Sequence, residues 1–599
     1  MDRIKTMNKI VEKIKGIIKK HCWIIILSFL LTTLIFAPLI VFPYIIKNEY
    51  QGININHFGS DAHFYLTRGK EVLGGHGLGN PVLREGKEEA DMLLYYSDYI
   101  LLAPIKLLGL ADKVDIVTVY NAYNFIGVFL LILLIYLFAW QLSGSKLLSA
   151  AAALFVIGGY SIIYFKTLFY NDFNVYSRVI YPYFSSLVTF IYLNLLIKAL
   201  KSPELKFKIL SAFSFGLLFY VYFYAWSFAL ALNGLLFLIF LFKKDFLSVK
   251  KILLISVGGL VLGSFYLFRL FPSLYSEIGN QKAYFIRMSS GTNPIFSKIG
   301  FATLVLFAIF WYLRRKDNNL FFILAIILSG WVALNQQIIT GKMLQYGHYY
   351  WYFIVPLSII VSFYMVWQLI ENKKWEKYLF VFIIILAFVN TIGGQYKSFF
   401  TTFETKKYEQ NFRPIIDYLN RDKTPGVILS PSSLTNSYLF TIYTSHDLFW
   451  HLAASFSNVP IQRFKDALFV YVYLNKDARN DFRVYLEKIS DNKAGESFDQ
   501  FLYRSLEGYW SGFDYYAYTN KLITNDSALA QKRPAIIDGL SKEYNETILK
   551  NNGIDKLLKQ YGVNYIVWDK NNDPEWDLSG IAGLNEVADS NNIFLFQVQ

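Results

Sequence analysis

The sequence predicts a polytopic α-helical membrane protein of about eleven transmembrane helices, followed by a C-terminal extracytoplasmic α/β domain. Three observations predict this fold class. Of the 599 residues, 54% are hydrophobic and only 17% are charged, whereas about a quarter of a soluble chain is charged. The apolar residues gather in runs of roughly 17–25, the length that crosses a bilayer as a helix. The residues after Gly394 are more polar and predict a domain outside the membrane.

The predicted spans begin with Cys22–Ile46, which is too long for a signal-peptide core and has no small-residue cleavage site. We therefore expect an uncleaved anchor. The long stretch Ile209–Phe242 fits two short helices that turn near Tyr224–Ser227. The other spans are Val117–Leu142, Leu147–Phe165, Tyr181–Leu200, Ile252–Leu270, Phe301–Leu313, Leu320–Leu334, Phe353–Ile370 and Tyr378–Thr391.

Basic residues predict the orientation of these spans, because cytoplasmic loops carry an excess of Lys and Arg. Met1–His21 holds seven Lys or Arg and two acids, and every second loop repeats this excess. The N-terminus is thus expected in the cytoplasm, and an odd number of spans puts the C-terminus outside. The net charge of +14 is then an orientation signal facing anionic lipid, which excludes nucleic acid as a partner.

The chain divides into three predicted parts. Residues 1–21 form a basic cytoplasmic N-terminus, residues 22–394 form the transmembrane domain with a long external loop at 47–115, and residues 395–599 form the extracytoplasmic domain. In that domain the sequence predicts one helix and three buried strands from the apolar runs and turn residues. These elements are Phe412–Leu419, Gly426–Leu429, Asn564–Trp568 and Ile593–Val598.

Motifs and composition exclude several function classes. The sequence has no Walker motif, dinucleotide fingerprint or His/Cys ligand cluster, and its single cysteine, Cys22, removes any internal disulfide framework. The predicted spans hold almost no ionisable residue, whereas ion-coupled transporters place such residues inside the membrane. The remaining single charges occur in short external loops, so we expect a site at the external membrane interface.

The first external loop reads as two amphipathic helices, which can lie in the headgroup plane. One begins directly after Asp61 in the stretch Gly59-Ser60-Asp61-Ala62-His63-Phe64-Tyr65-Leu66-Thr67-Arg68, and the other is Leu93–Gly109. Asp61 is well placed to cap the first helix, which is its structural interpretation.

The order of these features resembles the GT-C class of membrane glycosyltransferases. An acid comes soon after the first span, a loop of two interfacial helices follows, and a series of transmembrane spans comes after the loop. The phrase Ser60–Arg68 is similar to the Asp-x-Tyr-Tyr-His-x-Arg opening of oligosaccharyltransferase catalytic subunits. The resemblance covers about residues 20–395 in architecture. Because the C-terminal region lacks the Trp-Trp-Asp-Tyr-Gly sequence of those subunits, transfer of single sugars is the favoured prediction.

The resemblance implies a GT-C-like fold and a polyprenyl-phosphate sugar donor, with transfer to an extracytoplasmic glycan, lipid or protein acceptor and with inversion. An acceptor hydroxyl needs a general base, and a leaving phosphate needs cations or a metal. Asp61 matches the first-loop acid of the class and is predicted as base or metal ligand, with Asp172 of the second external loop as the other catalytic candidate. Asp61 and Asp172 would hold Mg²⁺ or Mn²⁺ only in a metal-dependent enzyme. Asn174 stands where oligosaccharyltransferases carry a second acid, which weakens the metal interpretation.

Further candidates lie in the external loops. For the donor phosphate they are Arg178, Arg287, Lys342 and His348, because guanidinium and other cationic groups bind phosphate. For the substrates they are His63, Tyr65 and Tyr176. Arg178 and His348 are alternatively interfacial residues of the aromatic belt, with no chemical role.

Three other functions stay open beside the transfer of a single sugar. They are protein glycosylation by an oligosaccharyltransferase-like enzyme, transport of a lipid or solute, and a catalytically inactive scaffold on the GT-C fold. In each case we expect a multi-pass protein embedded in the lipid bilayer of a prokaryotic plasma membrane.

Overall fold

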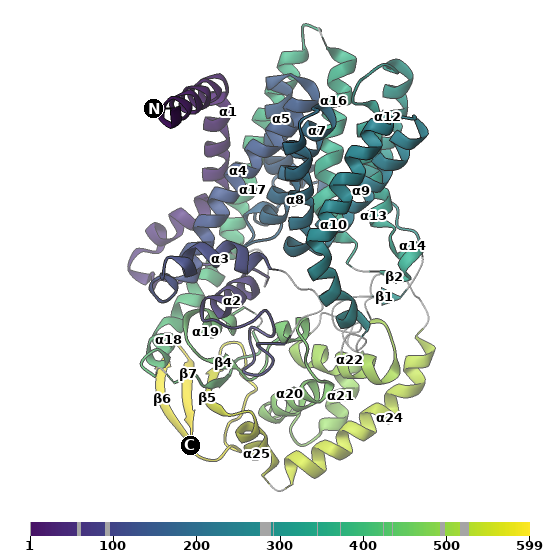
Figure 1. Cartoon of the computed structure of the whole chain (residues 1–599). Coiled ribbons are helices and arrows are strands. Elements are labelled where there is room, and N and C mark those ends of the chain that lie inside the picture. The colour runs from purple at the N-terminus through teal and green to yellow at the C-terminus, as the bar shows by residue number, and fades with distance from the viewer. Residues whose placement is uncertain are drawn as a thin grey trace.

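A helical bundle and a C-terminal domain stack end to end in the computed structural model, with the N-terminus at the far end of the bundle (Figure 1). The structure describes residues 2–56, 61–89, 96–275, 289–290, 293–343, 345–371, 373–422, 424–433, 435–491, 497–515, 526–550 and 552–599.

Helices occur at every predicted span. They are α1 (Asp2–Ile46), α4 (Ile116–Ser143), α5 (Lys146–Gly158), α7 (Tyr183–Lys201), α8 (Leu205–Val221), α9 (Phe223–Phe242), α10 (Phe246–Tyr275), α12 (Lys298–Leu313), α13 (Leu320–Leu334), α16 (Val355–Ile370) and α17 (Glu376–Glu409). Within the described residues, seven helical segments are long and apolar enough to cross a membrane, and α5, α12 and α13 are shorter apolar helices. The helical bundle is confirmed, and the number of eleven spans stays a prediction.

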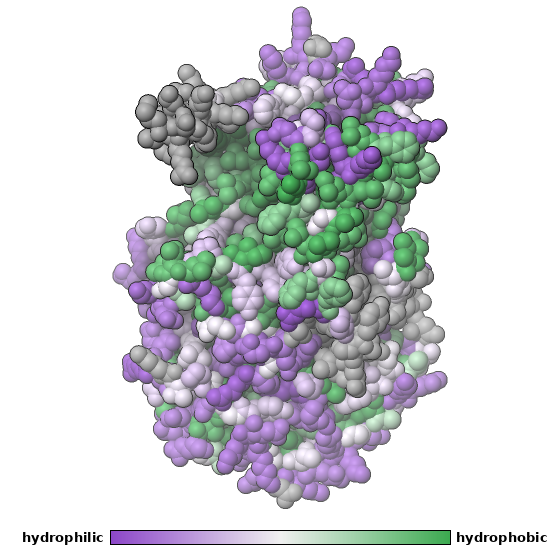
Figure 2. Space-filling view, in the orientation of Figure 1, coloured by the Kyte–Doolittle hydropathy of each residue, from purple (hydrophilic) through white to green (hydrophobic). Residues whose placement is uncertain are grey.

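On the face shown in Figure 2, apolar surface forms a belt across the bundle, with polar surface at the end of the bundle and over the C-terminal domain. Large exposed side chains such as Phe213, Val261 and Phe268 belong to this belt. Lipid chains would cover such side chains at little cost, whereas water would not. The chain is an integral membrane protein.

Local capping residues define the start of α4 and the tight turn between α4 and α5. The carboxylate of Asp115 accepts a hydrogen bond of 2.8 Å from the backbone N–H of Thr118 at the start of α4, which is a standard helix N-cap. Gly144 ends α4 with φ +70°, a left-handed conformation that glycine adopts without strain. The Ser145 hydroxyl then caps the start of α5.

The break between α8 and α9 falls at Tyr222, which is extended with φ −163° and ψ 129°. The predicted turn at Tyr224–Ser227 is therefore wrong by two residues. Tyr222 stacks on Tyr181 with ring centroids 4.6 Å apart, and its hydroxyl lies 2.7 Å from Nδ1 of His348. These tertiary contacts set the position of the break, and local sequence does not show them.

The first external loop contributes α2 (Asp61–Leu73) and α3 (Ser97–Leu107), which lie between the bundle and the C-terminal domain (Figure 1). Helix α2 is buried on most of its sides, so it is an internal helix and not a surface one. At Gly69 a Cβ atom would lie 2.4 Å from the Tyr120 ring, and glycine thus permits close packing of α2 on α4. In α3, Leu107 is exposed, as expected at a lipid headgroup layer.

The C-terminal domain contains a five-stranded sheet of order β4-β3-β5-β7-β6. Strands β4, β3 and β5 are parallel, and β5, β7 and β6 are antiparallel. The strands are β3 (Val427–Leu429), β4 (Asp447–Leu448), β5 (Val563–Asp569), β6 (Leu584–Ser590) and β7 (Ile593–Val598). The helices are α18 (Arg413–Leu419), α19 (Tyr438–Tyr443), α20 (Ile461–Leu474), α21 (Phe482–Asp491), α22 (Phe498–Ser511), α24 (Ser527–Tyr544) and α25 (Gly553–Gln560).

Helix α17 connects the two halves of the molecule. The predicted boundary at residue 394 falls inside this helix, which runs to Glu409 and continues through η5 (Gln410–Phe412) into α18. The Gln410 side chain accepts a hydrogen bond from the Gln51 N–H at 2.9 Å and donates one to the Ile53 carbonyl at 2.8 Å. The external segment after α1 is thereby held against the base of the domain.

Candidate active site

The second external loop supplies the centre of the candidate site. Its short helix η3 (Val175–Ser177) is capped by Asn174, whose side chain accepts from the Tyr176 N–H at 2.9 Å. From the first external loop, the Asn56 amide donates to the Ser177 carbonyl at 2.7 Å. These local bonds fix the backbone that carries the next residue, Arg178.

Arg178 forms an ion pair with Asp61, the first residue of α2. The Arg178 side chain is 6% exposed and that of Asp61 is 43% exposed, so the guanidinium is internal while the carboxylate can be reached from outside. A cation and an anion attract more strongly in such a partly dry site than in water. The structure thus brings together the predicted base and a predicted phosphate-binding residue.

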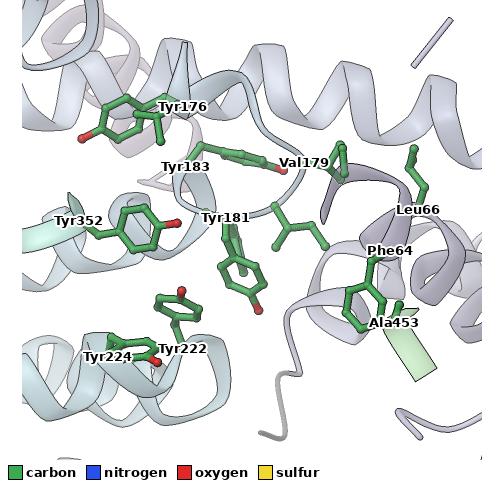
Figure 3. Close-up of a cluster of buried hydrophobic side chains, with 14 of the residues drawn as sticks. Phe64, Leu66, Tyr176, Val179, Tyr181, Tyr183, Tyr222, Tyr224, Tyr352 and Ala453 are labelled. Atoms are coloured by element: carbon green, nitrogen blue, oxygen red, sulfur yellow. The ribbon is translucent and has the colours of Figure 1, made fainter. Parts of the chain in front are cut away.

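Tyrosines surround the guanidinium of Arg178. Its Nη1 donates to the Tyr352 hydroxyl at 3.5 Å, and its Cζ lies 5.9 Å from the centroid of the Tyr65 ring. Figure 3 shows the wider group, to which η3, α7, the α8–α9 break and the π-helix η4 (Tyr350–Ile354) all contribute. The tyrosines labelled there are Tyr176, Tyr181, Tyr183, Tyr222, Tyr224 and Tyr352.

His348 belongs to the same aromatic group. Its Nδ1 lies 2.7 Å from the Tyr222 hydroxyl, and its ring centroid is 4.7 Å from that of Tyr224 and 5.5 Å from that of Tyr352. The Tyr352 ring contacts that of Tyr222 at 5.8 Å. A continuous set of contacts therefore runs from Asp61 through Arg178 and the tyrosines to His348.

A second buried ion pair holds α2 in place. Arg68 Nε donates to Oδ2 of Asp98 at 2.6 Å, and the Tyr120 hydroxyl donates to Oδ1 at 2.5 Å. Arg68 Cζ also lies 5.3 Å from the Tyr65 ring, so Tyr65 stands between Arg68 and Arg178. Sequence reasoning assigned no role to Arg68 or Asp98. Spacing was the available signal, because Asp61, Tyr65 and Arg68 fall at i, i+4 and i+7 on one helix face.

Asp172 lies in a different group of residues. Its carboxylate accepts from the adjacent Phe173 N–H at 2.8 Å, and it lines a small cavity together with Tyr170, Asn174 and Asn390. Burial raises the pKa of the Asp172 carboxyl above its usual value. That environment suits a structural carboxyl, or a carboxylate that is a stronger base than an exposed one.

The substrate candidates occupy three environments. Tyr65 is part of the Arg178 group, as described above. His63 is fully buried and stacks on Tyr438 of α19, with ring centroids 5.8 Å apart, so it faces the C-terminal domain. Tyr176 is buried against Tyr160 at 5.9 Å.

For two of the predicted phosphate-binding residues, the structure does not describe the position of the side chain. Arg287 lies outside the described residues. Lys342 is described by its backbone, in β2 (Lys342–Met343), which pairs antiparallel with β1 (Ser289–Ser290). Of the predicted donor-binding residues, Arg178 and His348 are therefore the two with described side chains.

The surroundings of Asp61 do not fit the predicted Mg²⁺ or Mn²⁺ site. The carboxylate oxygen that would bind a metal pairs with the Arg178 guanidinium, and Asp172 belongs to another group. The described part of the chain contains no group of three or more His, Cys, Asp or Glu residues that could hold a metal ion. Positive charge at this site comes from arginine.

Comparison with known proteins adds distant structural likenesses. No protein-family model and no curated protein matches the chain. ArnT from Cupriavidus metallidurans bound to undecaprenyl phosphate is similar over 74% of this chain and 89% of its own, with 11% identity and a TM-score of 0.45. The archaeal oligosaccharyltransferase AglB from Archaeoglobus fulgidus, in complex with an inhibitory peptide and a dolichol-phosphate, is similar over 92% of this chain and 70% of its own. Its identity is 11% and its TM-score 0.43.

At 11% identity the chemistry of this chain has to be argued from its own residues.

Proposed function

We propose that the protein is a membrane glycosyltransferase that moves a sugar from a polyprenyl-phosphate donor to an acceptor outside the membrane. The observation that carries the proposal is the pairing of Asp61 and Arg178 at the junction of the bundle and the external domain. Inverting transfer needs a carboxylate that accepts the proton of the acceptor hydroxyl. It also needs a cation that stabilises the charge developing on the leaving phosphate.

Arg178 has the properties of a phosphate-binding residue. Its planar guanidinium can offer two parallel N–H donors to phosphate oxygens. The side chain is buried and contacts Tyr352 and Tyr65, so a phosphate that reaches it loses most of its water and the attraction is strengthened. The tyrosine hydroxyls, such as that of Tyr352, are further donors for phosphate or sugar oxygens.

Donor binding would activate Asp61. The phosphate of the donor competes with the Asp61 carboxylate for the Arg178 guanidinium, and the released carboxylate becomes free to accept a proton. The acceptor oxygen then attacks the anomeric carbon from the face opposite the phosphate and passes its proton to Asp61. As the new C–O bond forms, the bond between the anomeric carbon and the phosphate oxygen breaks, and the electron pair stays on the phosphate beside Arg178.

The expected orientation of the protein in the membrane supports the same function. The Lys-rich N-terminus faces the cytoplasm, and α2, α3 and the C-terminal domain lie at the opposite end of the bundle (Figure 1). The donor headgroup reaches Arg178 from the outer leaflet while its polyprenyl chain stays against the apolar belt. His348, which contacts Tyr222, positions the aromatic wall on the far side of Arg178.

Replacing Asp61 with Asn tests the proposal. We expect Asp61→Asn to lower sugar transfer by about 10²–10⁴-fold, because the variant lacks a proton acceptor. Transfer is measured with purified full-length protein in proteoliposomes, with a panel of radiolabelled polyprenyl-phosphate sugars and a cell-envelope extract as acceptor.

Asp112→Asn is the matched control, since Asp112 is an exposed acid of the same external loop. It should transfer sugar like the wild type. Undiminished turnover of Asp61→Asn, at equal amounts of folded protein, would refute the proposed role.

A further inference from the structure

A polar groove lies where the outer end of α17 meets the C-terminal sheet. It has a volume of about 900 Å³, within the range of ligand-binding clefts. Its walls are η1 (Lys47–Glu49) with the chain that follows it, the last turns of α17 with η5, and three turns of the domain. One of these turns follows β5, and another joins β6 to β7.

Amide side chains dominate the groove. Of its seventeen lining residues, eight are Asn or Gln and four are Ser or Thr. Within the described chain its one lining cation is Lys407, which forms an ion pair of 2.7 Å with Glu49. Among its described residues, the groove therefore offers many neutral donors and acceptors and no positive charge outside this ion pair for a phosphate.

Hydrogen bonds hold several of these amides in fixed positions. Asn571 Nδ2 donates to the Tyr408 hydroxyl at 3.1 Å and to the Asn591 carbonyl at 3.1 Å. Asn591 Nδ2 in turn donates to Oδ1 of Asn411 at 2.7 Å. A wall that is ordered before the ligand arrives loses less conformational entropy on binding.

We infer that this groove binds a neutral oligosaccharide, which is the acceptor of the transfer. A primary amide presents a donor and an acceptor side by side, which matches the neighbouring hydroxyls of a sugar ring. A polyanion would lack cations here, and an acyl chain or apolar peptide side chain would find few apolar partners, since Tyr408 and Pro414 are the ring-bearing residues of the lining.

The groove is physically joined to the Arg178 loop. Gln51 lines the groove, and five residues later Asn56 donates to the Ser177 carbonyl, directly before Arg178. Five extended residues span at most about 18 Å. An oligosaccharide of several sugars can thus occupy the groove and bring its terminal hydroxyl to Asp61. In this form the inference rests on the proposed function.

Filling the groove tests the inference. Thr405 is an exposed residue of α17 that lines the groove, and Thr401 lies one turn earlier on the same helix outside the lining. Full-length protein in nanodiscs is titrated with neutral pentasaccharides of α-glucose, α-mannose and β-N-acetylglucosamine, and binding is followed by saturation-transfer NMR. We expect at least one probe to bind, Thr405→Trp to raise its Kd about tenfold or more, and Thr401→Trp to leave it unchanged.

Thr435→Trp fills the groove from the domain side and gives a second variant if Thr405→Trp does not fold. No binding by any of the three probes, or equal binding by Thr405→Trp and Thr435→Trp, would overturn the inference. So would a sequon peptide that binds the wild type and loses its binding in these variants.

Kinetics separate this inference from the proposed function. Thr405→Trp should raise KM for the pentasaccharide acceptor and leave transfer to a monosaccharide unchanged. Asp61→Asn should abolish both transfers and leave pentasaccharide binding unchanged. If Asp61→Asn transferred sugar normally while Thr405→Trp still weakened pentasaccharide binding, the role of Asp61 as base would be refuted and the binding role of the groove would not.

Discussion

The charges of Arg178 and Asp61 neutralise each other in the ion pair, and this pairing affects the basicity of the carboxylate. A carboxylate bound to a guanidinium is a poor base, because the ion pair favours its charged form. In the proposed mechanism the base therefore gains its strength only after a phosphate has occupied Arg178.

Replacing Arg178 with Lys keeps the charge and removes the planar pair of donors. We expect Arg178→Lys to lower kcat/KM for the lipid-linked donor by about 10–100-fold, the equivalent of one lost hydrogen bond to a charged group. Initial rates at varied donor concentration measure the effect. Arg269→Lys, an exposed arginine that donates to the Tyr96 hydroxyl at 3.0 Å, is the control and should behave as wild type. A donor dependence of Arg178→Lys equal to that of wild type would argue against phosphate binding by Arg178.

The site was only partly predictable from the sequence. Asp61, Tyr65, Arg178 and His348 were selected as single polar or aromatic residues in external loops, and they lie in one connected group. The Arg68–Asp98 pair was not predicted, because its members are 30 residues apart and lie on two separately predicted helices. Which charges meet across two loops depends on packing that a single sequence does not display.

Among the elements, α2 depends on the buried Arg68–Asp98 pair for its position. Asp98 is fully buried, and removing one member of such a pair leaves an uncompensated charge. We expect Asp98→Ala to lower the free energy of unfolding by about 3–5 kcal/mol. Thermal unfolding of the purified protein in detergent, followed by tryptophan fluorescence, measures the change.

Two companion variants separate charge from packing at this pair. Tyr120→Phe removes a single hydroxyl that donates to Asp98 and should cost less than Asp98→Ala. The double variant Arg68→Met with Asp98→Leu removes both charges and should recover most of the stability. A double variant as unstable as Asp98→Ala would show that the charge itself is not the cause.

The turn after β5 depends on a buried carboxyl. Burial raises the pKa of Asp573 to about 7, although Ser432 donates to it through its N–H and its hydroxyl. Between the ordinary pKa of 3.8 and the folded pKa of about 7, the unfolded chain releases the proton while the folded chain keeps it. Stability therefore falls as the pH rises through this window, by at most about 1.4 kcal/mol for each pH unit.

Asp573→Asn should remove this loss, because an amide does not titrate. The measurement is the midpoint of urea unfolding of the full-length protein between pH 4 and pH 7, compared with wild type. Asp577→Asn is the control, since the pKa of Asp577 is lowered by hydrogen bonds from Ser579, and it should keep the wild-type decline. An unchanged decline in Asp573→Asn would contradict the assignment.

Most elements of the bundle were predictable because apolar runs of membrane length have few other interpretations. The three predicted strands and the helix of the domain occur where expected, within one residue at each end. Strand β4 is two residues long and β6, with the sequence Leu-Asn-Glu-Val-Ala-Asp-Ser, is a polar edge strand. Neither has a periodic apolar pattern, so only the neighbouring strands define them.

For the whole molecule, the basic end of the bundle and the candidate site lie at opposite ends (Figure 1). If the Lys-rich loops face the cytoplasm, the site and the sheet face outward. In a Cys22→Ser background, a membrane-impermeant maleimide added to intact spheroplasts should label Ser579→Cys of the C-terminal domain. It should label Ser202→Cys, between α7 and α8, only after lysis. The reverse pattern would invert the orientation and place the transfer reaction in the cytoplasm.

Helix α17 is long enough to run from the membrane to the groove at its outer end. A helix of 34 residues is about 51 Å long at 1.5 Å per residue, whereas the hydrocarbon core is about 30 Å thick. Its outer part therefore extends beyond the hydrocarbon core and carries one wall of the groove. A change in bilayer thickness alters the tilt of the helix, and the same rotation moves the groove wall relative to the sheet. We therefore expect the acyl-chain length of the bilayer to affect the binding of a ligand in the groove.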